Sequence, residues 1–134
     1  MRFGNRVGIK TYMTYKSKEI CILNDEYKVV VVLGGEKEVR KCLSDYGYPK
    51  DFDLELDGKR GMTYYSETCH PVIALPRMPK TAEEIGTLAH EATHAVDDIM
   101  AHIGEGGTQE VFSHSVGAVV RGVLKWKKKK KRNM

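Results

Sequence analysis

The sequence predicts an α+β protein in which a small mixed β-sheet comes first and two long helices follow. Three observations predict this class. A β-branched run ends at two glycines (26–35), apolar and polar residues alternate around an Asp-Gly pair (51–67), and apolar residues recur at helical spacing in the C-terminal half. The chain has 134 residues, of which 41% are hydrophobic, and is long enough to bury one core. This order of elements favours helices packed on one face of a small sheet.

The N-terminal half predicts three strand regions and one helix. The run EYKVVVVLGG (26–35) is typical of a central strand buried on both faces. Residues 36–47 follow with apolar side chains at helical spacing and end in a glycine, which predicts a helix. The alternation in 51–67 predicts a hairpin. In CHPVIALP (69–76), two prolines bracket a short apolar run, which predicts an edge strand.

The C-terminal half predicts two helices. Thr81 and Glu84 have the spacing of a capping box, so we expect a helix from about 82 to 102. A glycine-rich break at 104–107 separates it from a second helix, expected from about 109 to 126.

The net charge of +4 comes from the last ten residues. Without the seven positive charges in 125–132, the remainder has a net charge of −3. We therefore expect one domain over 1–124 and a disordered basic tail over 125–134. Such a tail can contact nucleic acid through residues 125–132 without sequence specificity, or act as a localisation signal, or only increase solubility.

No apolar run approaches the length of a membrane span, and the N-terminus has no signal-like apolar stretch, so we expect a cytoplasmic protein without a membrane partner. The three cysteines are far apart and form no Cys-x-x-Cys pair, which argues against a disulfide framework and a cysteine-based zinc finger.

The first predicted long helix contains the candidate functional residues, in the stretch HEATH (90–94). His90 and His94 lie roughly 140–180° away from the apolar stripe of this helix, which argues against a buried core role. They form either a solvated polar face or a metal site. The stripe consists of Ile85, Leu88, Ala89, Ala92, Val96, Ile99 and Ile103.

The spacing favours zinc. Histidines at i and i+4 project from adjacent turns and can bind one ion. A catalytic zinc needs three protein ligands and a water. Glu91 lies to the side of the pair, where it can take a proton from the zinc-bound water and pass it to a leaving amine.

The third ligand must come from elsewhere. His102 is roughly 12 Å along the helix from His94, too far to share the ion, and suits a helix-end cation. Glu110, in the first turn of the second helix, is a better candidate, although it could also serve only as an N-terminal helix charge. His114, one turn later, and Asp98, on the polar face of the first helix, are candidates to hydrogen-bond a ligand.

The stretch HEATHAVDD (90–98) resembles the active-site helix of thermolysin-type zinc peptidases, the gluzincins, in sharing His-Glu-x-Thr-His-Ala-Val-x-Asp. In that family a following helix carries Asn-Glu-x-x-Ser-Asp, and this chain has QEVFSH (109–114) in that place. The resemblance covers roughly 81–117. It implies a minimal single-domain zincin fold of bacterial or phage type, with zinc bound by His90, His94 and Glu110 and with Glu91 as general base.

The chain also departs from the family. Gln109 replaces the motif's Asn, and His114 replaces its Asp, which supports a ligand in the family. Only the basic tail follows the second helix in this sequence, so we expect no counterpart of the domain that supplies a transition-state histidine in the family. His70, Tyr64 and Tyr65 are candidate oxyanion donors, with ordinary packing as the alternative for the tyrosines.

The resemblance further implies that an edge strand lies over the active-site helix and holds a peptide in extended form, a role that 69–76 would suit, with a purely structural edge strand as the alternative. We therefore predict a zinc metallopeptidase acting on a peptide or protein substrate. One alternative is a catalytically idle, zinc-stabilised binding module whose basic tail contacts nucleic acid, a virion or a partner protein. The other is a metal-free interaction domain with solvated histidines.

Overall fold

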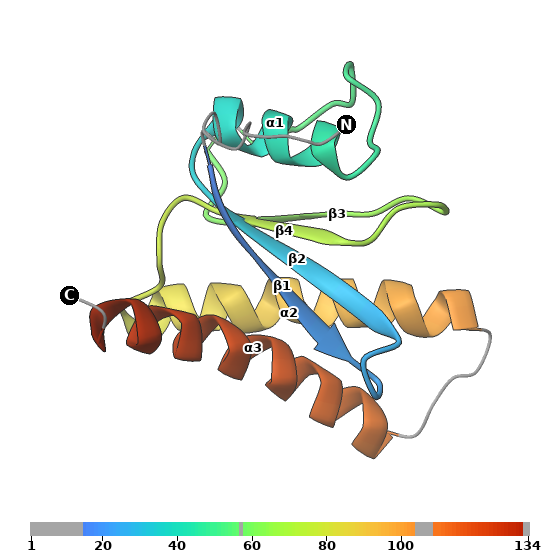
Figure 1. Ribbon diagram of the computed structural model, residues 1–134, viewed down its shortest axis with the longest axis vertical. Helices are drawn as coiled ribbons and strands as arrows, with labels where there is room; N and C mark the ends of the chain where they lie inside the picture. The colour runs from blue at the N-terminus through green and yellow to red at the C-terminus, as the bar shows by residue number, and fades with distance from the viewer. Residues whose placement is uncertain (1–14, 57, 104–108, 133–134) are drawn as a thin grey trace, which may run out of the picture.

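The computed structural model describes residues 15–56, 58–103 and 109–132, with side chains as far as Trp126. These residues form a mixed sheet of four strands and three helices, so the predicted α+β class is confirmed (Figure 1). In chain order the elements are β1 (Lys16–Ile22), β2 (Tyr27–Leu33), α1 (Glu36–Asp45), β3 (Met62–Tyr64), β4 (Val72–Leu75), α2 (Ala82–Ile103) and α3 (Gln109–Arg132).

The centre of the sheet is the parallel pair β2 and β4. The strand order is β1-β2-β4-β3, and the outer strands β1 and β3 run antiparallel to their neighbours. Val29 to Val32 in β2 are fully buried, which confirms the central strand expected in 26–35. Because side chains alternate along a strand, these valines require cover on both faces of the sheet.

Helices supply that cover from two sides. α1 lies on one face of the sheet, and α2 and α3 lie on the other (Figure 1). Val29, Val31 and Ile73 pack into the core under α2 and α3. Val30, Val32 and Val72 pack into the core under α1. Our expectation that the helices share one face is therefore wrong for α1, because β2 and β4 are apolar on both faces.

The apolar run 69–76 is not at the sheet edge. Its strand, β4, lies between β2 and β3, and all four of its residues are buried. Pro71 and Pro76 lie just outside the strand, where they remove no amide from the ladder. The carbonyl of Pro71 still accepts a hydrogen bond from the Val30 amide at 3.0 Å. The edge on this side of the sheet is β3.

The hairpin expected in 51–67 does not form. Residues 51–56 contain no strand, and β3 pairs with β4 instead. Asp57, at the expected turn, lies outside the described residues. Conversely, β1 was not predicted, because its lysines and Glu19 obscure the alternation that buries Ile20 and Ile22.

The capping box at the start of α2 is confirmed. The Glu84 amide donates to Thr81 Oγ1 at 3.1 Å, and the Thr81 amide donates to Glu84 Oε1 at 3.1 Å. A further hydrogen bond from the Lys80 amide and an ion pair with Arg77 also hold this carboxylate. The hydrogen bonds from the Lys80 and Thr81 amides to this carboxylate are the main reason that the pKa of Glu84 falls to about 2.

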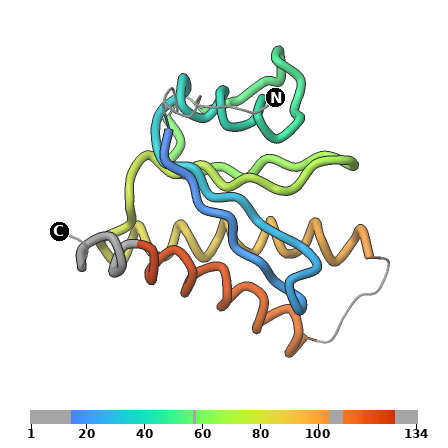
Figure 2. The backbone as a smooth tube through the Cα atoms, in the orientation of Figure 1, coloured from blue at the N-terminus to red at the C-terminus, as the bar shows by residue number. Residues whose placement is uncertain are grey.

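α2 and α3 lie side by side and run in opposite directions (Figure 2). α3 continues as a helix to Arg132, so the segment expected to be a disordered tail from residue 125 is helical in its described part. Lysine is a good helix former, and extending an existing helix needs no new nucleus. The expected contact of 125–132 with nucleic acid stays a prediction. No helix in the described ranges combines the length and apolar content needed to span a membrane.

Gly122 lets α3 approach β1 closely. A Cβ atom at this position would lie 2.9 Å from Ile20 Cδ1 and 3.0 Å from Ile20 Cγ1, closer than such atoms can pack. Gly86 in α2 is the natural comparison, because a Cβ there would have no neighbour within 4 Å.

Two alanine substitutions should separate helix propensity from packing. Gly86→Ala should raise the free energy of unfolding by roughly 0.5–1 kcal/mol, since alanine is the better helix former. Gly122→Ala has the same propensity gain but must displace Ile20, so it should be less stable than Gly86→Ala by at least about 1 kcal/mol. Urea denaturation measures both. Equal stabilisation by the two substitutions would show that α3 does not dock on β1 through Gly122.

Candidate metal centre

The two histidines of HEATH converge on the exposed side of α2. Both side chains are exposed, and their Nε2 atoms are 3.2 Å apart. The rings are nearly perpendicular, with centroids 4.7 Å apart and an interplanar angle of 88°. The helix brings them together because i and i+4 residues lie one above the other on the same face.

Their separation fits two ligands of one zinc ion. Zinc–nitrogen distances of 2.0–2.1 Å in a tetrahedron place two ligand nitrogens about 3.3–3.4 Å apart. The observed 3.2 Å is within a few tenths of an ångström of that value. The same contact is also compatible with a hydrogen bond between two neutral imidazoles, one donating and one accepting.

Glu91 lies beside this pair but is buried, with 8% of its surface exposed. The Thr63 hydroxyl in β3 donates a hydrogen bond to Glu91 Oε1 at 2.6 Å and lies 3.0 Å from the Glu91 backbone oxygen. The carboxylate is therefore held at the boundary between the polar face of α2 and the sheet.

A groove opens next to His90 and Glu91. One cavity of about 410 Å³ is lined by Arg60, Gly61, Glu83, Gly86, Thr87, His90 and Glu91. A second cavity, of about 420 Å³, shares Arg60, Glu83 and Thr87 with the first and extends to the start of α2. Together they form a groove between α2 and the chain that enters β3.

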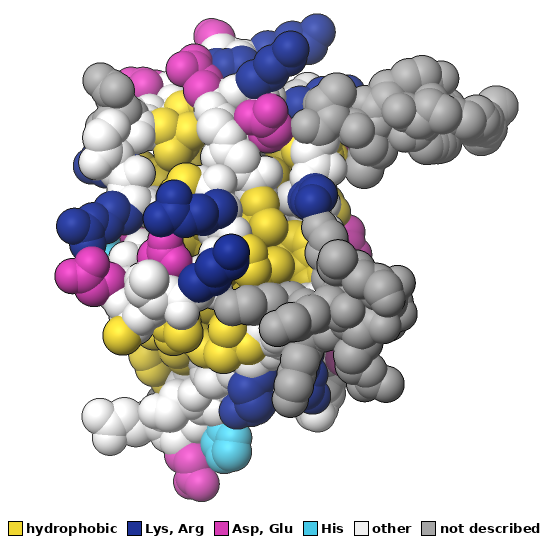
Figure 3. All heavy atoms as spheres, turned by 90° about the vertical axis from the view of Figure 1, so that its left-hand side faces the viewer, with side chains coloured by type: hydrophobic (Ala, Val, Ile, Leu, Met, Phe, Trp, Pro, Cys, Tyr) yellow, Lys and Arg dark blue, Asp and Glu magenta, His cyan; other side chains and the backbone are white. Residues whose placement is uncertain are grey.

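The groove carries charges of both signs. Arg77 binds Glu84 at 2.6 Å, and Arg60 lies 3.8 Å from Glu83. On the face of the molecule where α2 begins, Lys and Arg side chains are likewise interspersed with Asp and Glu (Figure 3). The groove therefore has no strong field of one sign that would select substrates by charge alone.

Glu110 is not brought together with the histidines. The described residues contain no group of three or more His, Cys, Asp or Glu side chains that could hold a metal ion. α3 packs on α2 and on β1, and β1 is the edge strand opposite to β3. The groove beside His90 lies on the β3 side of α2. Glu110 is exposed at the start of α3, and its role as a ligand stays a prediction.

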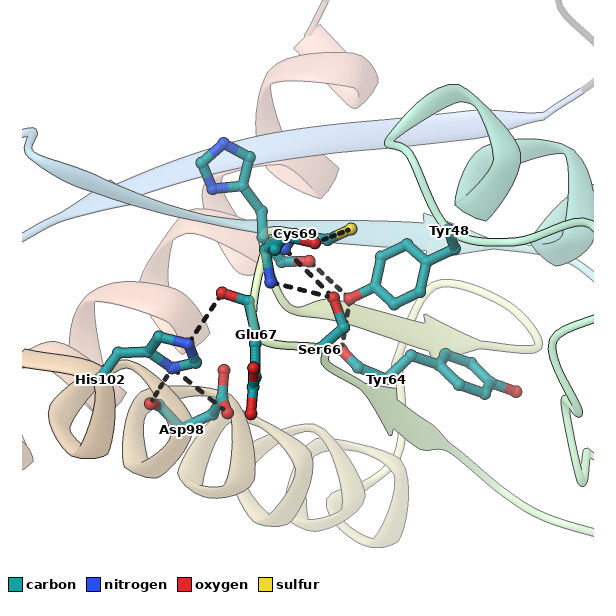
Figure 4. A network of polar contacts seen from close by, with 9 residues as sticks. Tyr48, Tyr64, Ser66, Glu67, Cys69, Asp98 and His102 are labelled. Atoms are coloured by element: carbon teal, nitrogen blue, oxygen red, sulfur yellow. Dashed lines mark hydrogen bonds and ion pairs between the residues drawn. The ribbon is translucent and has the colours of Figure 1, made fainter.

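Asp98 and His114 do not contact the histidine pair through any hydrogen bond found among the described residues. Asp98 lies 3.8 Å from His102 Nδ1 (Figure 4). Burial raises the pKa of the Asp98 carboxyl, while the charge of His102 opposes that rise. His114 is exposed on α3. The interactions of Asp98 therefore point along α2 towards His102 and not towards a ligand.

The three candidate oxyanion donors, Tyr64, Tyr65 and His70, lie in different environments. Tyr64 is buried in the core under α1, on the other side of the sheet from α2, and its hydroxyl donates to the Leu54 carbonyl at 2.6 Å. Since Thr63 faces α2, its neighbour Tyr64 must face away, so the structure does not support Tyr64 as a donor. Tyr65, at 50% exposure, and His70 are exposed beyond the ends of β3 and β4, and their roles stay predictions.

His102 fastens the end of α2 to the segment before β4. Its Nε2 lies 3.0 Å from the Glu67 carbonyl oxygen and its Nδ1 lies 3.2 Å from the Asp98 carbonyl oxygen (Figure 4). Carbonyl oxygens only accept hydrogen bonds, so both contacts are satisfied only when the ring is protonated. These two contacts, Asp98 first, raise the pKa of His102.

Stability should follow this titration. A raised folded-state pKa means that the His102 contribution is fully present below the unfolded-state pKa of about 6.5 and is lost as the pH rises through the folded-state value. The difference in free energy of unfolding between wild type and His102→Gln should therefore be larger at pH 5.5 than at pH 8.5. Urea denaturation at the two pH values measures it. A difference that is constant or grows with pH would contradict the assignment.

Comparison with known proteins adds no assignment, because no family model matches the chain and no match was found among curated proteins or solved structures. The site must therefore be interpreted from its own chemistry. The sequence motif singled out His90, Glu91 and His94 as candidates but not Thr63 or Gly61, which lie against Glu91 in the structure, since a threonine in a short strand is ordinarily a packing residue.

Proposed function

We propose that the protein is a zinc-dependent peptidase with a minimal zincin-like fold of the gluzincin type. The observation that carries this proposal is the 3.2 Å separation of the His90 and His94 Nε2 atoms, next to the buried carboxylate of Glu91. A solvated polar face has no need of two converging imidazoles, a held carboxylate and an adjoining groove.

The donor set suits zinc. Neutral imidazole is a preferred zinc ligand, and both rings are exposed, so an ion can reach them without unfolding the helix. We propose Glu110 as the third protein ligand from its place in the family motif; because Glu110 and the two histidines form no metal-binding group in the described structure, this ligation requires the start of α3 to move towards His90 and His94. When bound, zinc would polarise the scissile carbonyl and lower the pKa of the attacking water.

Glu91 then has a defined task. Glu91 lines the groove beside His90, so its carboxylate is the group proposed to accept a proton from the attacking water. It can later deliver that proton to the leaving amine nitrogen. A structural zinc site does not need such a base, so the presence of Glu91 favours an enzyme over a catalytically idle, zinc-stabilised binding module.

The edge strand β3 is the proposed substrate-binding strand, in place of 69–76. β3 is the outer strand that contacts α2, and the groove lies between α2 and the residues just before β3, Arg60 and Gly61. An extended peptide can add to such an edge strand through main-chain hydrogen bonds. The peptide bond to be cleaved would then lie over His90 and Glu91.

Metal content is the first test. Protein purified without chelator or histidine tag should contain about one zinc per chain by elemental mass spectrometry. His90→Ala and Glu110→Ala should each reduce this content, whereas His102→Ala, on the same helix as His90, should not. Retention of zinc by Glu110→Ala would remove Glu110 from the ligand set. A wild type that neither retains zinc nor binds it tightly would favour the metal-free alternative.

The general base has its own test. Glu91→Gln should keep the zinc content and the circular dichroism spectrum of the wild type, but lower the rate of hydrolysis of an unfolded protein substrate by roughly 10²- to 10⁴-fold. Peptide release measured by mass spectrometry gives the rate. Cleavage that survives this substitution would mean that Glu91 is not the base. Zinc binding without hydrolysis in the wild type would favour the idle binding module.

A further inference from the structure

We propose that Thr63 is a positioning residue for Glu91, so that the edge strand β3 both holds the peptide and aims the general base. This inference rests on the proposed peptidase function and assigns a role to a residue that the sequence motif does not contain. Thr63 acts through Glu91 and needs no contact with substrate or metal.

The contact itself is short and buried. Thr63 Oγ1 lies 2.6 Å from Glu91 Oε1, and the two residues are 9% and 8% exposed. An ionised carboxylate only accepts hydrogen bonds, so the threonine hydroxyl is the donor. Hydrogen bonds to charged acceptors are stronger than neutral ones, and removing one partner of a buried pair leaves the other without its donor.

The same hydroxyl also contacts the helix backbone, because it lies 3.0 Å from the Glu91 carbonyl oxygen. Because the hydroxyl has a single proton, the shorter contact with Oε1 is its main hydrogen bond, and the backbone oxygen is a secondary acceptor of the same proton. Oε1 accepts the hydrogen bond from Thr63, and no hydrogen bond to Oε2 was found among the described residues, so Oε2 is the oxygen proposed to accept a proton from water.

Gly61 brings the strand close enough for this contact. A Cβ at Gly61 would lie 2.9 Å from Thr87 Cγ2 and 3.3 Å from Glu91 Cγ. Only a residue without a side chain therefore lets the chain before β3 lie directly on this turn of α2. Gly61 and Thr63 enclose Glu91 from the strand side, while the groove leaves it open beside His90.

The strand alternation explains why Thr63 has this position. Thr63 pairs with Ile73, which packs into the core under α2 and α3, so its side chain points to α2. The adjacent residues Met62 and Tyr64 point into the core under α1. A register shift of one residue would replace the hydroxyl at Glu91 by a large apolar side chain. Pairing of a peptide along β3 would thus also fix its position relative to the base.

The test is a double-substitution cycle in the full-length, zinc-loaded protein. Thr63→Val should lower kcat by about 10- to 100-fold with little change in KM and no loss of zinc, as expected when a partner that orients a catalytic group is removed. Thr63→Ser keeps the hydroxyl and should restore most of the rate. In the Glu91→Gln background, Thr63→Val should have almost no further effect, because the hydroxyl acts through that carboxylate.

The outcomes separate this proposal from the proposed function. Hydrolysis that depends on Glu91 but is unchanged in Thr63→Val overturns the role of Thr63 and leaves the peptidase standing. An equal loss in the wild-type and Glu91→Gln backgrounds, or no rescue by serine, would reveal a purely structural role and also overturn the proposal. Absence of zinc-dependent hydrolysis in the wild type overturns both. Gly61→Ala, which keeps the hydroxyl but forces the strand away from α2, should lower kcat independently.

Discussion

The structure depends on the burial of β2 and β4 on both faces. Four consecutive valines in β2 alternate between two cores, so the sheet needs a helical layer on each side. α1 supplies one layer, and α2 with α3 supplies the other. Because α3 packs on α2 and β1, the flank of α2 beside β3 stays open.

That open flank places the candidate site. The apolar stripe of α2 must face the sheet, which turns His90 and His94 outwards. Glu91 lies at the border between these two surfaces, where a carboxylate needs a hydrogen-bond donor. β3 provides that donor through Thr63 and gives room for it at Gly61. The same geometric constraint thus exposes the two candidate ligands, buries the proposed base and leaves an edge strand next to them.

Polar contacts at both ends of α2 hold this helix in place. At its start, the capping box between Thr81 and Glu84 fixes the first turn, and Arg77 joins the same carboxylate. At its end, His102 binds the carbonyl of Glu67 in the segment before β4. The candidate ligands lie between these two anchors. A helix fixed at both ends can hold two imidazoles in one geometry without a metal ion.

Local patterns in the sequence determined a substantial part of this description. Helical periodicity and the capping box gave α2 its start and its polar face, and the i, i+4 spacing gave the histidine pair, because these features depend on residues within one or two turns. The β-branched run gave the central strand for the same reason. The strand β1 was missed and the hairpin in 51–67 was wrongly expected, since short strands with charged residues form or fail according to their partners.

Only the tertiary structure decided how the segments meet. It placed β4 inside the sheet and made β3 the edge, because prolines outside a strand do not prevent pairing. It turned Tyr64 away from the site and Thr63 towards Glu91. It also set Glu110 apart from the histidines, because α3 packs beneath the opposite edge of the sheet. Sequence spacing determines which side chains share a helix face, whereas the packing of that helix against the sheet determines which distant side chains reach it.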